Sequence, residues 1–150
     1  MSKRKVTGFF IIFAIIFFAF IIYLSQVRYQ SHLVLGGKNF IVEVADTNFL
    51  LEKGLSGHIP LYDNGGMLFI FKTPEKYGFW MKDMNFPIDI IWIDKDSKIV
   101  YIEKFVLPST YPKVFYPETD SLYVLEINAG HSEDLGLKIG DNVKFLKKWF

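Results

Sequence analysis

Cysteine is absent from the 150 residues of this chain. Its absence excludes disulfide bonds, thiolate catalysis, zinc sites built on cysteine and lipid attachment to an N-terminal cysteine. Histidine is scarce, with only His32, His58 and His131, which are far apart in the chain. Since no two of them form a His-x-x-x-His pair, we expect no metal site and no cofactor.

The motifs of several enzyme classes are also missing. The sequence contains no Gly-x-Ser-x-Gly elbow, no phosphate-binding loop and no dinucleotide fingerprint. Asp94, Asp96 and Lys98 superficially resemble the opening of a calcium loop. The glycine and glutamate that such a loop requires are replaced by Ile99 and Phe105, so a hairpin turn is the better interpretation. The sequence therefore does not identify a reaction.

Charge is distributed unevenly along the chain. Residues 1–32 contain four basic residues and no acidic residue, whereas the 13 basic and 16 acidic residues that follow give a net charge of −3. A mildly acidic domain without a basic stripe is a poor nucleic-acid binder. We therefore expect no nucleic-acid partner.

The longest uncharged stretch covers residues 8–24 and is almost wholly apolar. As a helix it would span about 25 Å, the short end of the range for a transmembrane segment. Lys3, Arg4 and Lys5 precede it, which predicts a cytoplasmic N-terminus. A cleaved signal peptide is the alternative, but its apolar region is usually shorter, and no small-x-small cleavage site follows. We predict a single-pass anchor in the lipid of the cell membrane, with the C-terminal domain outside.

The remaining chain divides into a basic segment (1–7), a tether (25–32), one domain (33–146) and a tail (147–150). Apolar runs rich in β-branched and aromatic residues predict strands at 33–35, 40–45, 67–71, 79–81, 88–93, 99–106, 122–127 and 142–146. Residues 73–75 read as a turn, and residues 107–119 as a long loop. Residues 48–53 form a predicted short helix, capped at Asp46-Thr47 and ended by Gly54. We predict a mainly β domain, a compact sandwich or small barrel with one or two short helices, preceded by a single transmembrane helix.

Residues 79–94 are the expected centre of the domain, read as two strands joined by a turn at residues 83–86. In that hairpin, Lys82 lies diagonally opposite Asp89, within reach of a long side chain. The sequence therefore predicts an ion pair between these two residues. Phe79, Trp80 and Trp92 are close by, either as core residues or as a platform on which a sugar or lipid stacks.

Two acidic residues stand in otherwise apolar strands. Alternation places Asp89 on the strand face of Ile91 and Ile93, and Glu126 on the face of Val124. A carboxylate on an apolar face must find a partner or shift its pKa. Such groups are candidates for acid–base catalysis or ligand contact, and the alternative is a paired charge that fixes strand register.

Four segments resemble the DUF192 family, also known as UPF0127. They are Val44-Ala45-Asp46-Thr47 with Gly54-Leu55; Gly66-Met67-Leu68-Phe69-Ile70-Phe71; Phe79-Trp80-Met81-Lys82 with Pro87-Ile88-Asp89-Ile90; and Tyr123-Val124-Leu125-Glu126 with Asn128-Ala129-Gly130 and Gly140-Asp141. The chain departs from the family pattern at Ser56, His58 and Asp83-Met84, where Met, Arg and Asn-Thr are common. The resemblance implies a compact, mostly β domain and no particular reaction.

We expect this domain to bind a small polar ligand or an envelope component. Two alternatives are a hydrolase that uses Glu126 and Asp89 as acid and base, and a structural partner in a membrane complex. No catalytic residue is assigned. The candidate ligand-binding residues are Asp46, Trp80, Lys82, Asp89, Glu126, Asn128 and His131.

Overall fold

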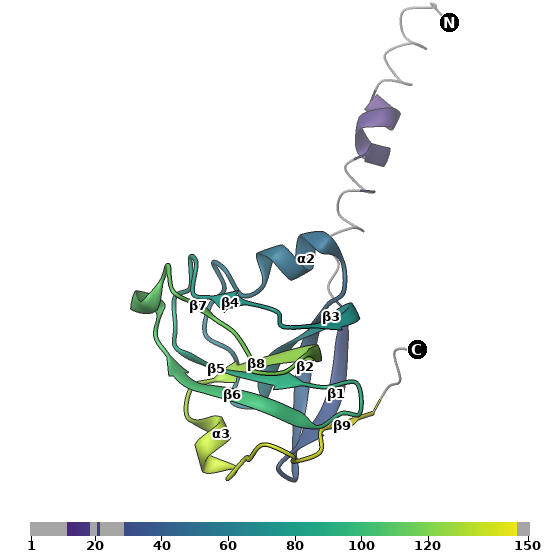
Figure 1. The fold of residues 1–150 in the computed structure, drawn as a ribbon. Coiled ribbons are helices and arrows are strands. Elements are labelled where there is room, and N and C mark those ends of the chain that lie inside the picture. Colours follow the sequence, from purple (N-terminus) through teal and green to yellow (C-terminus); the bar gives the residue numbers. More distant parts are fainter. Residues whose placement is uncertain (1–11, 19–20, 22–28, 147–150) are drawn as a thin grey trace, which may run out of the picture.

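The computed structural model describes residues 12–18, 21 and 29–146 (Figure 1). Residues 12–18 and 21 are helical and exposed. Most of the predicted anchor at 8–24 lies outside the described residues, and so do the basic segment 1–7, tether residues 25–28 and the tail 147–150. Among the residues that are described, no helix is both long enough and apolar enough to cross a membrane.

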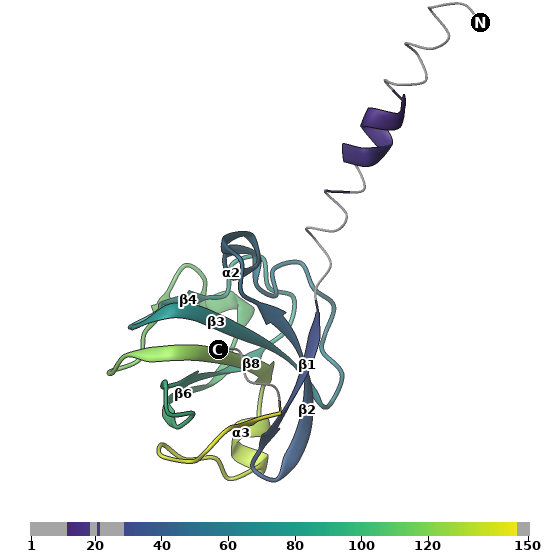
Figure 2. The ribbon, with the colours of Figure 1, turned by 90° about the vertical axis from the view of Figure 1, so that its right-hand side faces the viewer.

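A single sheet of seven strands forms the domain, in the order β6-β5-β8-β3-β2-β1-β9. Its strands are β1 (Gln30–Leu35), β2 (Lys38–Ala45), β3 (Gly65–Glu75), β5 (Ile88–Ile93), β6 (Ile99–Val106), β8 (Ser121–Asn128) and β9 (Lys144–Phe145). Strands β2 and β3 pair in parallel, and the other neighbours are antiparallel. The predicted mainly β fold is confirmed, in the form of one sheet that curls into a half-barrel (Figure 2).

The chain segment before β9 links the two edges of this curled sheet. Asn142 forms a β-bridge with Lys98 at the start of β6, while the next residues pair with β1 at the opposite edge. Backbone hydrogen bonds support the bridge, from Ile99 N to Asp141 O (2.9 Å) and from Val143 N to Ser97 O (2.8 Å). The half-barrel is therefore held in its curved shape by a C-terminal strap.

Short elements cover the sheet from opposite sides (Figures 1 and 2). Helix α2 (Asn48–Lys53) lies on the same side as a two-stranded ribbon made of β4 (Phe79–Trp80) and β7 (Val114–Phe115), while α3 (His131–Asp134) lies on the other. A 3₁₀ turn, η1 (Pro108–Thr110), precedes β7. The predicted hairpin within residues 79–94 is wrong, because β4 pairs with β7 whereas β5 pairs with β6 and β8.

Local sequence signals account well for several elements. The Thr47 hydroxyl accepts the Leu50 N–H (3.3 Å) at the start of α2, and Gly54 ends the helix with a φ of 48°. Both the helix and its caps match the prediction. Several boundaries differ from the prediction. Strand β1 begins at Gln30 inside the predicted tether, β3 continues through the predicted turn at 73–75, and the last predicted strand is shortened to β9 (Lys144–Phe145).

Two hydrophobic cores lie on the two faces of the sheet. We call them the inner core, on the side of α3, and the outer core, under α2 and the β4–β7 ribbon. The inner core includes Leu33, Phe40, Leu68, Ile91, Ile93, Leu125, Ile127 and Val143. The outer core includes Leu50, Met67, Phe69, Phe79, Met81, Ile90, Trp92, Phe115 and Val124. Strand β8 contributes to both, since alternate side chains point to opposite faces.

Candidate functional site

Glu126 lies on central strand β8, on the face of the outer core. It pairs in register with Met67 of β3 and Ile90 of β5, so its nearest cross-strand neighbours are apolar. Its side chain is 4% exposed, and its Oε2 atom has no hydrogen-bond partner. Burial disfavours the charged form and raises the pKa of Glu126 from its ordinary 4.5 to about 8. At neutral pH the group is therefore mostly a neutral carboxylic acid.

The Glu126 side chain lines a cavity of about 130 Å³ between α2, β3 and β4. We call this space the Glu126 cavity. Five of its lining residues are aromatic: Phe69, Phe71, Tyr77, Phe79 and Trp80. Leu51, Glu52, Lys53, Gly54, Leu55, Ser56, Gly78 and Met84 complete the lining. The buried Glu126 carboxyl group thus meets several aromatic rings, while Glu52 and Lys53 add exposed charges to the lining.

The aromatic walls hold one another in place. The Phe69 ring meets Phe79 edge-on, with ring centroids 4.8 Å apart, and Phe79 meets Trp92 edge-on at 5.8 Å. Phe71 stacks on Tyr77. The Trp92 indole N–H donates to the Tyr77 carbonyl (2.8 Å), which ties the segment before β4 to the sheet. These contacts make the enclosure a preformed one, because edge-to-face pairs fix ring orientation.

A wider groove of about 440 Å³ adjoins the Glu126 cavity on the outside. Glu52, Lys53, Ser56 and Trp80 line both spaces, so the outer groove and the cavity share a boundary. Phe49, Lys82 and Asp83 complete its lining. Phe49 is 57% exposed and Trp80 is 49% exposed, which places two large apolar side chains at the mouth.

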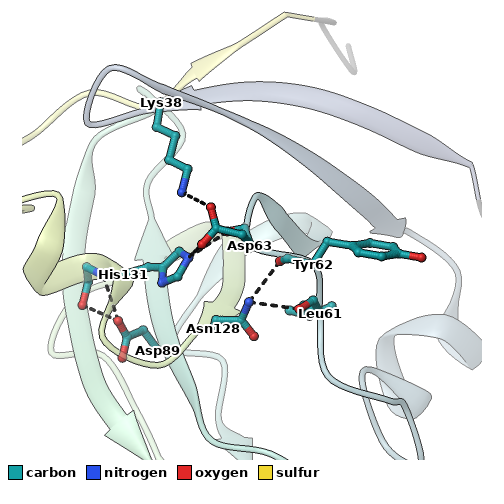
Figure 3. A network of polar contacts seen from close by, with 8 residues as sticks. Lys38, Leu61, Tyr62, Asp63, Asp89, Asn128 and His131 are labelled. Atoms are coloured by element: carbon teal, nitrogen blue, oxygen red, sulfur yellow. Dashed lines mark hydrogen bonds and ion pairs between the residues drawn. The ribbon is translucent and has the colours of Figure 1, made fainter.

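Asp89, the second buried acid, has a different environment on the inner face of the sheet (Figure 3). Its Oδ1 accepts the backbone N–H groups of Phe105 (2.8 Å) and Gly130 (3.1 Å). Its Oδ2 accepts the backbone N–H (2.9 Å) and hydroxyl (2.6 Å) of Ser132. All four bonds fix the start of α3 and the end of β6, so Asp89 is a structural anchor.

His131 and Asn128 attach the loop that precedes β3 to the α3 end of the domain (Figure 3). The His131 Nε2 lies 2.7 Å from the Asp63 carbonyl and 3.2 Å from its carboxylate. Asn128 donates to the carbonyls of Leu61 (3.2 Å) and Tyr62 (3.0 Å). Lys38 also contacts Asp63 (2.7 Å), and this hydrogen bond and charge lower the pKa of the Asp63 carboxyl.

The predicted ion pair between Lys82 and Asp89 is wrong. Asp89 is bound by backbone groups and Ser132, whereas the exposed Lys82 lines the outer groove on the opposite side of the sheet. The physical reason is the failed hairpin, since β4 leaves the sheet to pair with β7. Asp63, on the loop before β3, forms ion pairs with Lys38 and His131 instead.

The structure sorts the seven predicted candidates into separate places. Trp80, Lys82 and Glu126 come together around the Glu126 cavity and the outer groove. Asp89, Asn128 and His131 belong to the α3 end. Asp46 accepts the Tyr29 hydroxyl (2.7 Å), and burial together with this bond raises the pKa of Tyr29 to about 12. No group of three His, Asp or Glu side chains suited to a metal ion occurs within the described residues.

Sequence reasoning missed most of the cavity lining, notably Phe69, Phe71, Tyr77 and the residues of α2. A signal for part of it was present. Alternation along β3 puts Phe69 and Phe71 on the face of Met67, which pairs with Glu126. The contribution of α2 had no such signal, because helix and sheet meet only in the folded domain.

Comparisons with known proteins agree with this fold. Residues 32–145 match the profile of the DUF192 family, described as "Uncharacterized ACR, COG1430". A crystal structure of a candidate transcription regulator from Sinorhizobium meliloti 1021 is 27% identical, with a TM-score of 0.72 over 79% of this chain and 94% of that one. A protein of unknown function from Novosphingobium aromaticivorans DSM 12444 is 29% identical, with a TM-score of 0.69 over 78% of this chain and 84% of that one.

No curated protein gives a significant match. The family match covers well over half of the sequence and includes all of the sheet except the first two residues of β1. This chain therefore belongs to the DUF192 family.

Proposed function

We propose that this domain binds a small organic ligand in the Glu126 cavity. The observation that carries the proposal is the unpartnered Oε2 atom of a buried carboxyl group that faces an aromatic-lined space. A buried polar group without a partner costs about 1–3 kcal/mol of stability. A ligand that bonds to Glu126 would remove that cost.

Cavity size suggests how a ligand would be placed. Typical ligand sites measure about 300–1,000 Å³, and the Glu126 cavity alone is smaller, at about 130 Å³. The cavity accommodates one end group, and the outer groove of about 440 Å³ accommodates the rest of the molecule. Trp80 lines both spaces, so it would contact the ligand at the junction.

A hydrolase that uses Glu126 and Asp89 together is less well supported. Glu126 pairs with Ile90 and Asp89 pairs with Ile127, so the two carboxyl groups point to opposite faces of the sheet. Other hydroxyl groups at the cavity are already used as donors, because Ser56 donates to Lys82 O (2.8 Å) and Tyr77 to Thr73 O (2.7 Å). The two carboxyl groups of the predicted acid–base pair therefore do not meet at one site.

Regulation of transcription by direct DNA contact is also poorly supported. A DNA-binding surface needs clustered basic residues, and the chain after position 32 carries a net charge of −3. A structural role in a membrane complex is the remaining alternative. It predicts that the Glu126 cavity stays dry and that no small molecule stabilises the domain.

A thermal-shift screen of small organic compounds tests the proposed binding. A compound that binds the folded state raises the unfolding temperature. The Ser56→Trp variant should abolish this rise, because residue 56 lines both the cavity and the groove and a large side chain there blocks the passage. Glu118→Gln is the matched control at an exposed position. If no compound stabilises the protein, or if Ser56→Trp responds like the wild type, the proposed site is wrong.

The domain is further proposed to lie outside the cell membrane. The support is the sequence of residues 1–24, with its basic start and apolar run. Protease added to intact cells should then digest the β domain while a cytoplasmic marker protein stays intact. Protection of the domain, or its release as a shorter soluble protein, would contradict the anchored topology.

A further inference from the structure

We propose that the end group held in the Glu126 cavity is an organic ammonium ion, bound as an ion pair with Glu126 inside the aromatic walls. This inference rests on the proposed function, since it specifies the chemistry of the same ligand. It follows from which groups the cavity offers and which it lacks.

The polar inventory of the cavity is short. Glu126 provides the one unpartnered buried atom recorded among the described residues, and it is an oxygen. The Tyr77 and Ser56 hydroxyl groups already donate to backbone carbonyls. Glu52 and Lys53 also line the cavity, but both are exposed. An end group with one charged or donating centre and an otherwise apolar surface suits the buried Glu126 oxygen and the aromatic walls.

The sign of the charge follows from the walls. Aromatic faces attract cations, and Phe69, Phe71, Tyr77, Phe79 and Trp80 are among the residues that line the space. An anionic end group would instead meet the Glu126 carboxyl group. Among these rings Trp80 is the strongest partner for a cation, because indole has the largest attraction of the aromatic side chains.

Neighbouring charges do not neutralise Glu126. Helix α2 contributes Glu52 and Lys53 to the lining, and the segment before β4 contributes Tyr77. The Lys53 side chain extends toward Gly57, beyond the C-terminal end of α2. Among the residues that the structure describes, no ion pair joins Lys53 to Glu126. The register partners on β3 and β5, Met67 and Ile90, are uncharged.

The outer groove would admit a cation. Its four charged residues are Glu52, Lys53, Lys82 and Asp83, two of each sign. Entry is therefore not opposed by a net positive field. The ammonium group of the ligand then pairs with Glu126 in the cavity beyond the groove.

Binding of the cation is coupled to the release of a proton from Glu126. The neutral Glu126 acid gives up its proton to solvent, and the resulting carboxylate pairs with the R–NH₃⁺ group, with no covalent bond to the ligand. Because only the ionised protein binds the cation, the affinity rises about tenfold per pH unit below the pKa of about 8 and levels off above it. A neutral ligand that merely fills the cavity shows no such dependence.

The test uses three probes with short alkyl chains: n-butylammonium, n-butanol and butyrate. NMR titration of the ¹⁵N-labelled full chain, between pH 6 and pH 8, gives each dissociation constant. We expect n-butylammonium to bind most tightly, with about tenfold higher affinity at pH 7 than at pH 6. Glu126→Gln should remove this pH dependence and reduce the affinity for n-butylammonium to that for n-butanol, while Glu118→Gln should change neither.

Three results overturn the inference. The first is tighter binding of n-butanol or butyrate than of n-butylammonium, and the second is an n-butylammonium affinity that does not change with pH. The third is no binding of n-butylammonium. If neutral compounds still stabilise the wild type but not Ser56→Trp, the cavity remains a binding site and only the ammonium assignment fails.

Discussion

Asp89 and Glu126 are both buried acids on adjacent strands, yet their surroundings are opposite. Asp89 accepts four hydrogen bonds and lies on the inner face of the sheet. Glu126 lies on the outer face with an unpartnered oxygen and a cavity in front of it. The hydrogen-bond partners of a buried carboxyl group therefore decide whether it points to a function. A fully bonded carboxyl group is accounted for by its structural role.

The largest expected loss of stability follows from replacing Asp89. We expect Asp89→Ala to lower the free energy of unfolding by about 4 kcal/mol or more, because it leaves buried donors without an acceptor. Asp89→Asn should lower the free energy of unfolding by a smaller amount than Asp89→Ala. The Asn side-chain oxygen still accepts hydrogen bonds, but its NH₂ group faces other donors. Urea denaturation measures both. A loss below about 1 kcal/mol for Asp89→Ala would contradict the structural role.

Glu126→Gln should raise the free energy of unfolding, in contrast to Asp89→Ala. The folded protein keeps Glu126 protonated up to a pKa of about 8, whereas the unfolded chain releases that proton near 4.5. Between these values the folded state binds more protons, so wild-type stability falls as pH rises. The stability advantage of the variant should grow by roughly 3 kcal/mol between pH 4.5 and pH 7. Denaturation curves at several pH values measure this difference, and a constant difference would refute it.

Ser132→Ala tests the contribution of one hydrogen bond to Asp89. It removes the hydroxyl that donates to Asp89 Oδ2 (2.6 Å) but leaves three backbone donors in place. We expect a loss of about 1.5 kcal/mol in the free energy of unfolding. Binding of n-butylammonium should be unchanged, because α3 and the Glu126 cavity lie on opposite sides of the sheet. A changed affinity would show that the two regions are coupled.

Trp80→Ala should affect binding more than folding. The side chain is 49% exposed, so we expect the free energy of unfolding to change by less than about 1 kcal/mol. The affinity for n-butylammonium should fall several-fold, as expected for the loss of one cation–π contact. Tyr62→Ala is the matched control, an exposed aromatic residue that lines a different cavity. Equal loss of affinity in both variants would place the binding elsewhere.

Much of the fold could be predicted from local sequence. Thr47 and Gly54 mark the ends of α2, and Gly36 and Gly37 have the positive φ angles of the turn between β1 and β2. The apolar runs of β5, β6 and β8 were recognised within one residue of their bounds. These successes share a cause, because caps, tight turns and strand alternation depend on residues close together in the chain.

The pairing of strands was harder to predict. Strand β4 follows the pattern of a hairpin partner for β5, but it pairs with β7, whose two residues lie some 35 positions further along. A two-residue strand has no pattern that selects its partner. The choice depends on how Phe79 and Phe115 pack into the outer core, which is a property of the assembled domain.

The sequence by itself determined that Asp89 and Glu126 stand in apolar strands, and alternation determined which neighbours share their faces. Tertiary structure alone decided which acid found partners. The donors to Asp89 come from residues 16 to 43 positions away, and the walls around Glu126 come from α2, β3 and β4. Hydrogen bonds and cavity walls depend on distances between segments far apart in the chain, and only the folded arrangement sets those distances.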